Sequence, residues 1–370
     1  MINLNASRPM YRFTNRSFYL DLPLLGFLLV LISIGLVILY SASNENINMV
    51  LRQALRLMLA MGVMVLFACI PPHKYKMWTP WIYGIGLALL LAVMVMGKIG
   101  KGAQRWLDLG VFRFQPSEIM KLAVPMMTAW YLDRKPSPIT IKSCCIAGLL
   151  IFLPALLIAK QPDLGTAIMV IAAGVCVVFI AGIPLRIILF IGLAIGLAAP
   201  LMWHVMHDYQ KQRIYTLLNP EQDPLGSGYH IIQSKIAIGS GGAFGKGWLD
   251  GSQSHLNFLP EHATDFIFAV SGEEFGFVGS LILIIIIVLI SLRSLRIAEH
   301  AQTPFTRLLA ASLAMTFFLS AFVNIGMVMG ILPVVGIPLP LVSYGGSAMI
   351  TFLASFGILM SISSHRIAFK

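Results

Sequence analysis

The chain is dominated by apolar runs of about 20 residues, the length of a helix that crosses the hydrocarbon core of a bilayer. Its 370 residues contain ten such runs, at approximately 20–41, 51–70, 78–97, 116–133, 143–160, 164–182, 185–206, 266–292, 306–331 and 340–363. Only 11% of the residues are charged, whereas a water-soluble surface needs roughly a quarter. The sequence therefore predicts an all-α polytopic membrane protein, a single integral-membrane domain over residues 1–370.

The basic residues orient the predicted spans, because Lys and Arg gather in short cytoplasmic loops. With the N-terminus in the cytoplasm, the short inner loops hold Lys74, Lys76, Arg134, Lys135, Lys142, Arg186, Arg293, Arg296 and Arg307. We therefore expect both termini in the cytoplasm and one long extracytoplasmic loop at 207–265. A topological role for these residues explains the net charge of +11 without a nucleic-acid partner.

One basic stretch opposes this rule and points to a function. Five basic residues fall on the predicted outer side at Lys98, Lys101, Arg105, Arg113 and Lys121. Arg105 and Lys121 lie closest to the membrane, where they could receive a diphosphate. Glu118 and Lys121 are three residues apart and can pair on one helix face, either as a structural ion pair or as part of a cavity wall. Asp163, near Lys160, forms another candidate polar pair at the same level.

Asp265 is the candidate catalytic carboxylate. Five apolar residues follow it directly, which places it at the outer membrane boundary, where an ionised group is costly. A carboxylate there can serve as a general base for a hydroxyl group. The alternative is a helix N-cap, because Asp before an apolar helix satisfies free backbone amides. The two roles are compatible.

The 207–265 loop contributes two further candidate cations, Lys235 and Lys246. Residues 229–238 have the spacing of an amphipathic helix on the membrane surface. The glycine-rich run at 239–247 lacks the spacing and the Ser/Thr of a Walker phosphate loop, which leaves an anion-binding nest or a flexible turn. The histidines of this loop lack metal-ligand spacing. We assign no metal site.

The most specific segment runs from Asn324 to Ala348 and joins two predicted spans without a single charge. Its prolines and the pair Gly345-Gly346 predict irregular backbone inside the bilayer, which is tolerated where it lines a cavity or is buried in protein. The alternative is a helix-packing motif of small residues.

This segment resembles the C-terminal motif of the shape, elongation, division and sporulation (SEDS) family. The resemblance extends through nearly the whole chain after residue 19. It is carried as well by Thr264-Asp265-Phe266-Ile267-Phe268, Gln115-Pro116-Ser117-Glu118, Gln161-Pro162-Asp163-Leu164-Gly165 and Tyr229-His230-Ile231-Ile232-Gln233-Ser234-Lys235.

The resemblance implies a peptidoglycan glycosyltransferase of the bacterial cytoplasmic (inner) membrane, polymerising lipid II on the extracytoplasmic side during cell elongation. Asp265 would then be the catalytic base of an inverting transfer. The substrate cavity would be lined by Arg105, Glu118, Lys121, Asp163, Lys235, Lys246, Ser343, Gly345 and Gly346.

The implied partners are lipid II, undecaprenyl-diphosphate-linked glycan, a class B penicillin-binding protein, other membrane proteins of the elongation complex and the lipid bilayer. A divalent cation is compatible with a leaving diphosphate, but no residues are assigned to it. Two alternatives remain: a flippase for the lipid-linked precursor, which needs no base, and a non-catalytic activator of the penicillin-binding protein.

Overall fold

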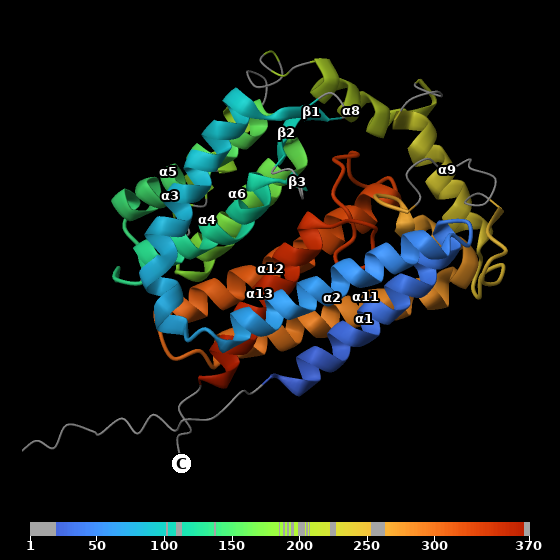
Figure 1. Ribbon diagram of the computed structural model, residues 1–370. Helices are drawn as coiled ribbons and strands as arrows, with labels where there is room; N and C mark the ends of the chain where they lie inside the picture. The colour runs from blue at the N-terminus through green and yellow to red at the C-terminus, as the bar shows by residue number, and fades with distance from the viewer. Residues whose placement is uncertain are drawn as a thin grey trace, which may run out of the picture.

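The computed structural model describes residues 20–100, 103–108, 113–136, 138–184, 208–222, 227–252 and 263–365, with isolated positions between 186 and 206 (Figure 1). Its helices are α1 (Leu22–Ala42), α2 (Ile47–Cys69), α3 (Pro72–Met96), α4 (Pro116–Leu132), α5 (Ile141–Lys160), α6 (Leu164–Ile180), α8 (Asp208–Leu218), α9 (Ser227–Ser240), α11 (Ile267–Glu299), α12 (Pro304–Val328) and α13 (Ser347–Ser364). These bounds confirm a helical membrane architecture.

Seven helices of the described chain are long and apolar enough to span a bilayer: α1, α2, α3, α5, α11, α12 and α13. The apolar helix α6 has 17 residues, one turn short of a full span, and α4 carries Glu118 and Lys121. Half of the residues in the predicted span at 185–206 lie outside the described residues. The total of ten spans therefore stays a prediction.

The helices form two groups that lie side by side (Figure 1). One group contains α1, α2, α11, α12 and α13, and the other contains α3, α4, α5 and α6. Helix α12 joins them by packing on both α4 and α6. Because successive helices alternate in direction, α4, α6, α11 and α13 all begin at one end of the bundle, which we call the site end.

Side-chain hydrogen bonds and ion pairs join helices at the end of the bundle opposite the site end. Arg293 of α11 donates two hydrogen bonds, of 2.9 and 2.7 Å, to the carboxylate of Asp21, which also caps α1 through Leu24 N. Asp133, after α4, accepts from Lys76 Nζ at 2.5 Å and from Phe305 N at 2.7 Å. These contacts join α1 to α11, and α4 to both α3 and α12, at the end away from the site.

A small antiparallel sheet lies between α3 and α4 at the site end (Figure 1). It has the order β1 (Lys98–Gly100), β2 (Ala103–Asp108), β3 (Arg113–Phe114). The basic stretch predicted on the outer side therefore includes this sheet, an element that apolar periodicity did not predict.

Helix α11 is interrupted at Gly276 (φ 66°, ψ −160°), and the glycine-rich turn of residues 241–247 docks on the break. Phe277 N and Val278 N donate to the carbonyls of Gly242 and Ala243 at 2.9 and 3.1 Å. In return, backbone amides of the turn donate to the carbonyls of Glu273 and Glu274. The turn thereby replaces the helical hydrogen bonds that the break removes, as a membrane-embedded backbone requires.

Gly245→Ala should lower the free energy of unfolding by about 2–5 kcal/mol. Gly245 has φ +84°, and a Cβ there would overlap the Glu274 carbonyl oxygen. Gly239→Ala is the matched control, because nothing lies within 4 Å of its Cβ position. Melting curves of the detergent-purified variants measure the effect. Equal melting temperatures for the two variants would contradict the docked turn.

The predicted amphipathic helix exists as α9, but its buried face packs on protein. Ile231, Ser234 and Ala237 are buried, and α9 packs on α11 and α12. Ser234 Oγ donates to Val328 O at 2.8 Å, which ties α9 to the end of α12.

The last span begins later than predicted, at Ser347 instead of residue 340. Residues 329–346 are not helical apart from turns, because Pro338 and Pro340 cannot continue a helix and Gly330 and Gly336 adopt positive φ. We call residues 329–346 the re-entrant segment. The predicted irregular backbone of the C-terminal motif is therefore confirmed.

Candidate functional site

Asp265 lies in a turn directly before α11, and the re-entrant segment holds that turn. Tyr344 N donates to Ala263 O at 2.9 Å. Ser343 Oγ donates to Thr264 O at 2.6 Å and accepts from Leu339 N at 2.8 Å. The N-cap position of α11 is Phe266, with no side-chain cap. The alternative interpretation of Asp265 as the N-cap residue is therefore wrong.

Asn324 of α12 clamps the backbone of Asp265. Its Nδ2 donates to Asp265 O and to Ile337 O, each at 2.8 Å, and the residue is fully buried. One amide group thus uses both of its hydrogens to join the turn before α11 to the re-entrant segment. The Asp265 carboxylate faces Gly336, whose Cβ position lies 3.5 Å from Oδ2.

Val335, the residue before Gly336 in the re-entrant segment, contacts the start of α6. A Cβ on Gly165 would lie 2.6 Å from Val335 O, so the two backbones are in direct contact. Because Val335 and Gly336 are adjacent, this contact places the first turn of α6 next to the Asp265 turn. The re-entrant segment therefore forms a wall that contacts both the Asp265 turn and the polar cluster at the start of α6.

The starts of α4 and α6 are joined by Gln115. Its Nε2 donates to Asp163 Oδ2 at 2.8 Å and to Ser117 Oγ at 2.9 Å. Asp163 is the N-cap of α6 and accepts from Thr166 N at 3.3 Å. The two similar sequence motifs Gln115-Pro116-Ser117 and Gln161-Pro162-Asp163 thus form two helix starts that meet.

One helical turn into α4, Lys121 Nζ and Glu118 Oε1 form an ion pair of 2.6 Å. The two residues are only 7% and 6% exposed. Within the described part of the chain, Glu118 Oε2 is buried without a hydrogen-bond partner. Such an oxygen can accept from a hydroxyl group or a water that enters the site.

Other predicted residues lie in different surroundings. Lys246 Nζ pairs with the buried Glu273 Oε1 at 2.7 Å beside the break in α11, and Lys235 extends over Gly330 after α12. Arg105 belongs to β2, but its side chain is outside the described part. Gly346 is the N-cap of α13, and nothing lies within 4 Å of a Cβ on Gly345.

Sequence reasoning missed Gln53 and Arg56 on α2 and the role of Asn324. Gln53 Nε2 donates to Ser343 O at 3.1 Å, and the Arg56 guanidinium lies 4.9 Å from the centre of the Tyr344 ring. Two polar residues three apart inside an apolar span were the available signal, because such residues face protein or a cavity.

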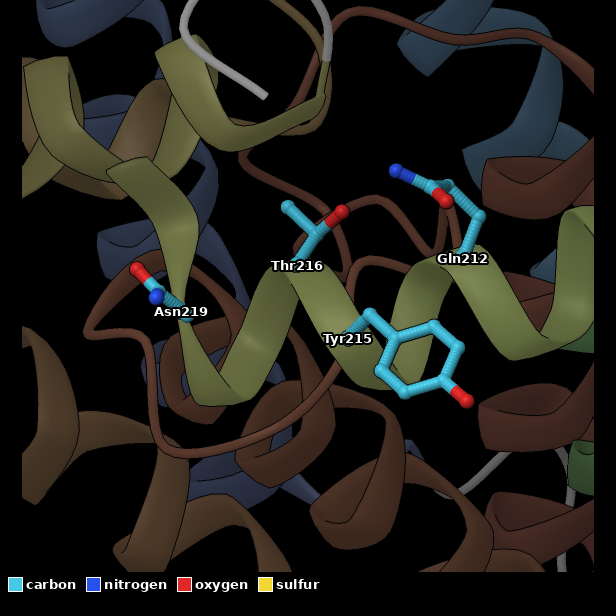
Figure 2. A pocket seen from close by; sticks show the side chains of 4 residues that line it. All are labelled: Gln212, Tyr215, Thr216 and Asn219. Carbon is cyan, nitrogen blue, oxygen red and sulfur yellow. The ribbon is translucent and has the colours of Figure 1, made fainter. Parts of the chain in front are cut away.

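Two pockets elsewhere are lined by none of the predicted site residues. The first, of about 270 Å³, lies along α8 and is lined by Gln212, Tyr215, Thr216 and Asn219 (Figure 2). Figure 2 shows these side chains leaving one helical stretch in different directions. The second, of about 470 Å³, is an apolar pocket between α6, α11 and α12. The first pocket has no charged lining residue, and the charged residues of the second, Glu299 and Arg307, lie at the end of the bundle opposite the site.

Comparison with known proteins decides the family. The profile of the family described as "Cell cycle protein", built on FtsW, RodA and SpoVE, matches residues 17–368. The chain belongs to the SEDS family. The peptidoglycan glycosyltransferase MrdB of Escherichia coli K12 is 54% identical over 352 residues, which cover 94% of each chain.

Solved structures of SEDS proteins share the fold. A chain of a peptidoglycan synthase complex matches with a TM-score of 0.84 at 32% identity, covering 95% of this chain and 100% of that one. RodA of Thermus thermophilus, a rod shape determining protein, gives a TM-score of 0.71 at 29% identity, covering 94% and 97%. The motif resemblance to the SEDS family is thereby confirmed.

Proposed function

We propose that this SEDS protein is a peptidoglycan glycosyltransferase that polymerises lipid II, with Asp265 as the general base. In the reaction, a sugar hydroxyl of one lipid-linked chain attacks the anomeric carbon of another, and a prenyl diphosphate leaves. Inversion at this carbon requires one base for the hydroxyl proton and positive charge for the leaving diphosphate.

The observation that carries the proposal is the shared wall at the re-entrant segment. Gly336 faces the Asp265 carboxylate, and the adjacent Val335 contacts the first turn of α6 at Gly165. The α6 start is joined through Gln115 to α4, which carries Lys121. The proposed base and the proposed cation thus belong to neighbouring elements, which supports the proposal.

The roles follow from these places. Asp265 takes the hydroxyl proton, Lys121 and Arg105 stabilise the diphosphate, and Glu118 and Asp163 orient the sugars from the first turns of α4 and α6. Lys235 and Lys246 are further candidates for diphosphate contact. Ser343 holds the Asp265 turn through Thr264, Gly345 leaves space beside it, and Gly346 begins α13. A divalent cation sharing the diphosphate charge remains part of the proposal, without assigned ligands.

The proposed location is the bacterial cytoplasmic membrane, with the site end facing outward. The opposite end carries the basic residues Lys76, Arg134, Lys135 and Arg296 at its helix ends, which the positive-inside rule assigns to the cytoplasm. A class B penicillin-binding protein is the proposed partner. The similarity to a chain of a peptidoglycan synthase complex supports this assignment.

The test is polymer formation from purified lipid II by the reconstituted protein with its penicillin-binding partner. The partner carries a disabled transpeptidase, so that glycan strands accumulate uncrosslinked. We expect strands on gels of labelled product. Transport of labelled lipid II across liposomes without strand formation would instead support the flippase alternative.

A further inference from the structure

We propose that Arg56 and the first turn of α13 bind the diphosphate of the second lipid-linked substrate. This inference rests on the proposed function, because a reaction that joins two prenyl-diphosphate chains needs two places for phosphate. Lys121 on α4 serves one side of the re-entrant segment. The Arg56 site, made of Gln53, Arg56, Tyr344 and Gly346, lies on its other side, where α2 and α13 run side by side (Figure 1).

Arg56 carries a positive charge at membrane depth without a carboxylate partner in the described part of the chain. It lies nine residues into α2, about 14 Å along the helix, and is half-buried. Its contact is the face of the Tyr344 ring, 4.9 Å away. An aromatic face offsets part of the cost of burying the charge, but it provides no oxygen acceptor for the five N–H donors of a guanidinium.

A second source of positive potential meets Arg56 at the same place. Gly346 is the N-cap of α13, and no side chain caps this helix. Arg56 Cδ and Nε lie 3.8 and 3.9 Å from the Cβ position of Gly346. The free amides of a helix N-terminus and a guanidinium repel each other unless an anion lies between them. The re-entrant segment thus presents a helix N-terminus inside the bilayer, as broken helices of transporters do for anionic substrates.

Gln53 supplies an independent indication that a ligand enters here. It is 1% exposed, and its Nε2 donates to Ser343 O and contacts Met349 Sδ across the start of α13. Its Oε1 is buried without a hydrogen-bond partner in the described part. A buried acceptor of this kind needs a donor, and a sugar hydroxyl attached to the diphosphate provides one.

A backbone hydrogen bond connects the Arg56 site to the turn that carries Asp265. Tyr344, which stacks under Arg56, donates its backbone N–H to Ala263 O, two residues before the carboxylate. Gly345 lies between Tyr344 and Gly346, and nothing occupies the space within 4 Å of its Cβ position. A sugar whose diphosphate is held at Arg56 therefore approaches Asp265 from the α2 side, opposite to a chain held at Lys121.

The test measures binding of undecaprenyl diphosphate to the reconstituted complex in phosphatidylcholine nanodiscs. Wild-type protein should bind two equivalents. Arg56→Gln should weaken one of them by about tenfold to a hundredfold, the value of a charge-assisted hydrogen bond, and leave the other unchanged. Arg52→Gln is the matched control, since Arg52 is exposed one turn earlier on α2 and should change affinity less than about twofold.

Three outcomes would overturn the inference: unchanged binding in Arg56→Gln, an equal loss in Arg52→Gln, or an equal loss for the uncharged undecaprenol. Adding phosphatidylglycerol should leave the second equivalent in place. Its disappearance would show that ordinary anionic headgroups fill the site and would overturn the substrate assignment.

A measurement on the wild-type protein covers the case in which Arg56→Gln does not fold. Undecaprenyl diphosphate should slow hydrogen exchange of the amides at residues 347–349, and unchanged exchange would overturn the inference. Neither measurement involves turnover. Failure of the Arg56 site is therefore distinguishable from failure of the proposed transferase activity, which polymer formation tests.

Discussion

Asp265→Asn should lower the rate of glycan polymerisation from lipid II by about 10²–10⁴-fold, the usual contribution of a general base. The amide has nearly the shape of the carboxylate but cannot take the hydroxyl proton. The fold should survive, because the contacts that hold the turn use the backbone of Asp265 and its neighbours Ala263 and Thr264. The loss should therefore appear in kcat, with little change in lipid II binding.

The measurement is strand synthesis by the purified complex, with lipid II binding and melting temperature determined on the same preparation. Asp250→Asn is the control, since Asp250 is an exposed carboxylate of the loop after the glycine-rich turn. It should polymerise at close to the wild-type rate. Persisting synthesis in Asp265→Asn would remove the base assignment and leave the transferase in need of another residue.

The same variant separates the three functional classes. A flippase needs no base, so it would continue to move labelled lipid II across liposomes after Asp265→Asn. A non-catalytic activator would leave strand synthesis to another enzyme. A complex of purified components would then form no strands, with the wild-type protein or with Asp265→Asn. Only the transferase predicts strands that disappear with this one carboxylate.

Features determined by local sequence were predictable. The apolar runs located α1, α4, α5 and α6 within two residues at each end, because the length of a span is set by the bilayer. The pairing of Glu118 with Lys121 followed from their spacing on one helix face. The irregular backbone before α13 followed from its prolines and glycines, although the start of that helix was placed seven residues too early.

Features that depend on distant partners were not predictable. Gln53 and Ser343 are 290 residues apart, and Asn324 reaches back 59 residues to Asp265. No local pattern distinguishes these polar residues from others in apolar spans. The break in α11 at Gly276 was missed for a related reason, since it is stable only because the turn at 241–247 supplies the missing hydrogen bonds. The ion pair between Lys246 and Glu273 likewise depends on the packing of that turn against α11.

Lys121→Met should reduce strand synthesis about 10²-fold or more, because a cation that stabilises a leaving diphosphate acts where charge develops in the transition state. It should also destabilise the fold by about 3–5 kcal/mol, since Glu118 is then left as an uncompensated buried charge. A loss of activity in this single variant is therefore ambiguous, and the pair has to be treated as a unit.

The double variant Lys121→Met/Glu118→Gln resolves the ambiguity. Removing both charges should restore most of the melting temperature, because the buried charge is gone, while synthesis stays low, because the cation is gone. A structural ion pair predicts the opposite: stability and synthesis would recover together in the double variant. Lys76→Met is the matched control at the opposite end, where Lys76 pairs with Asp133 at 2.5 Å and is 35% exposed. It should also lower the melting temperature, because the Asp133 side chain is only 8% exposed and loses its cation. Synthesis should stay unchanged, because a pair at the opposite end of the bundle cannot reach a diphosphate held at the re-entrant segment.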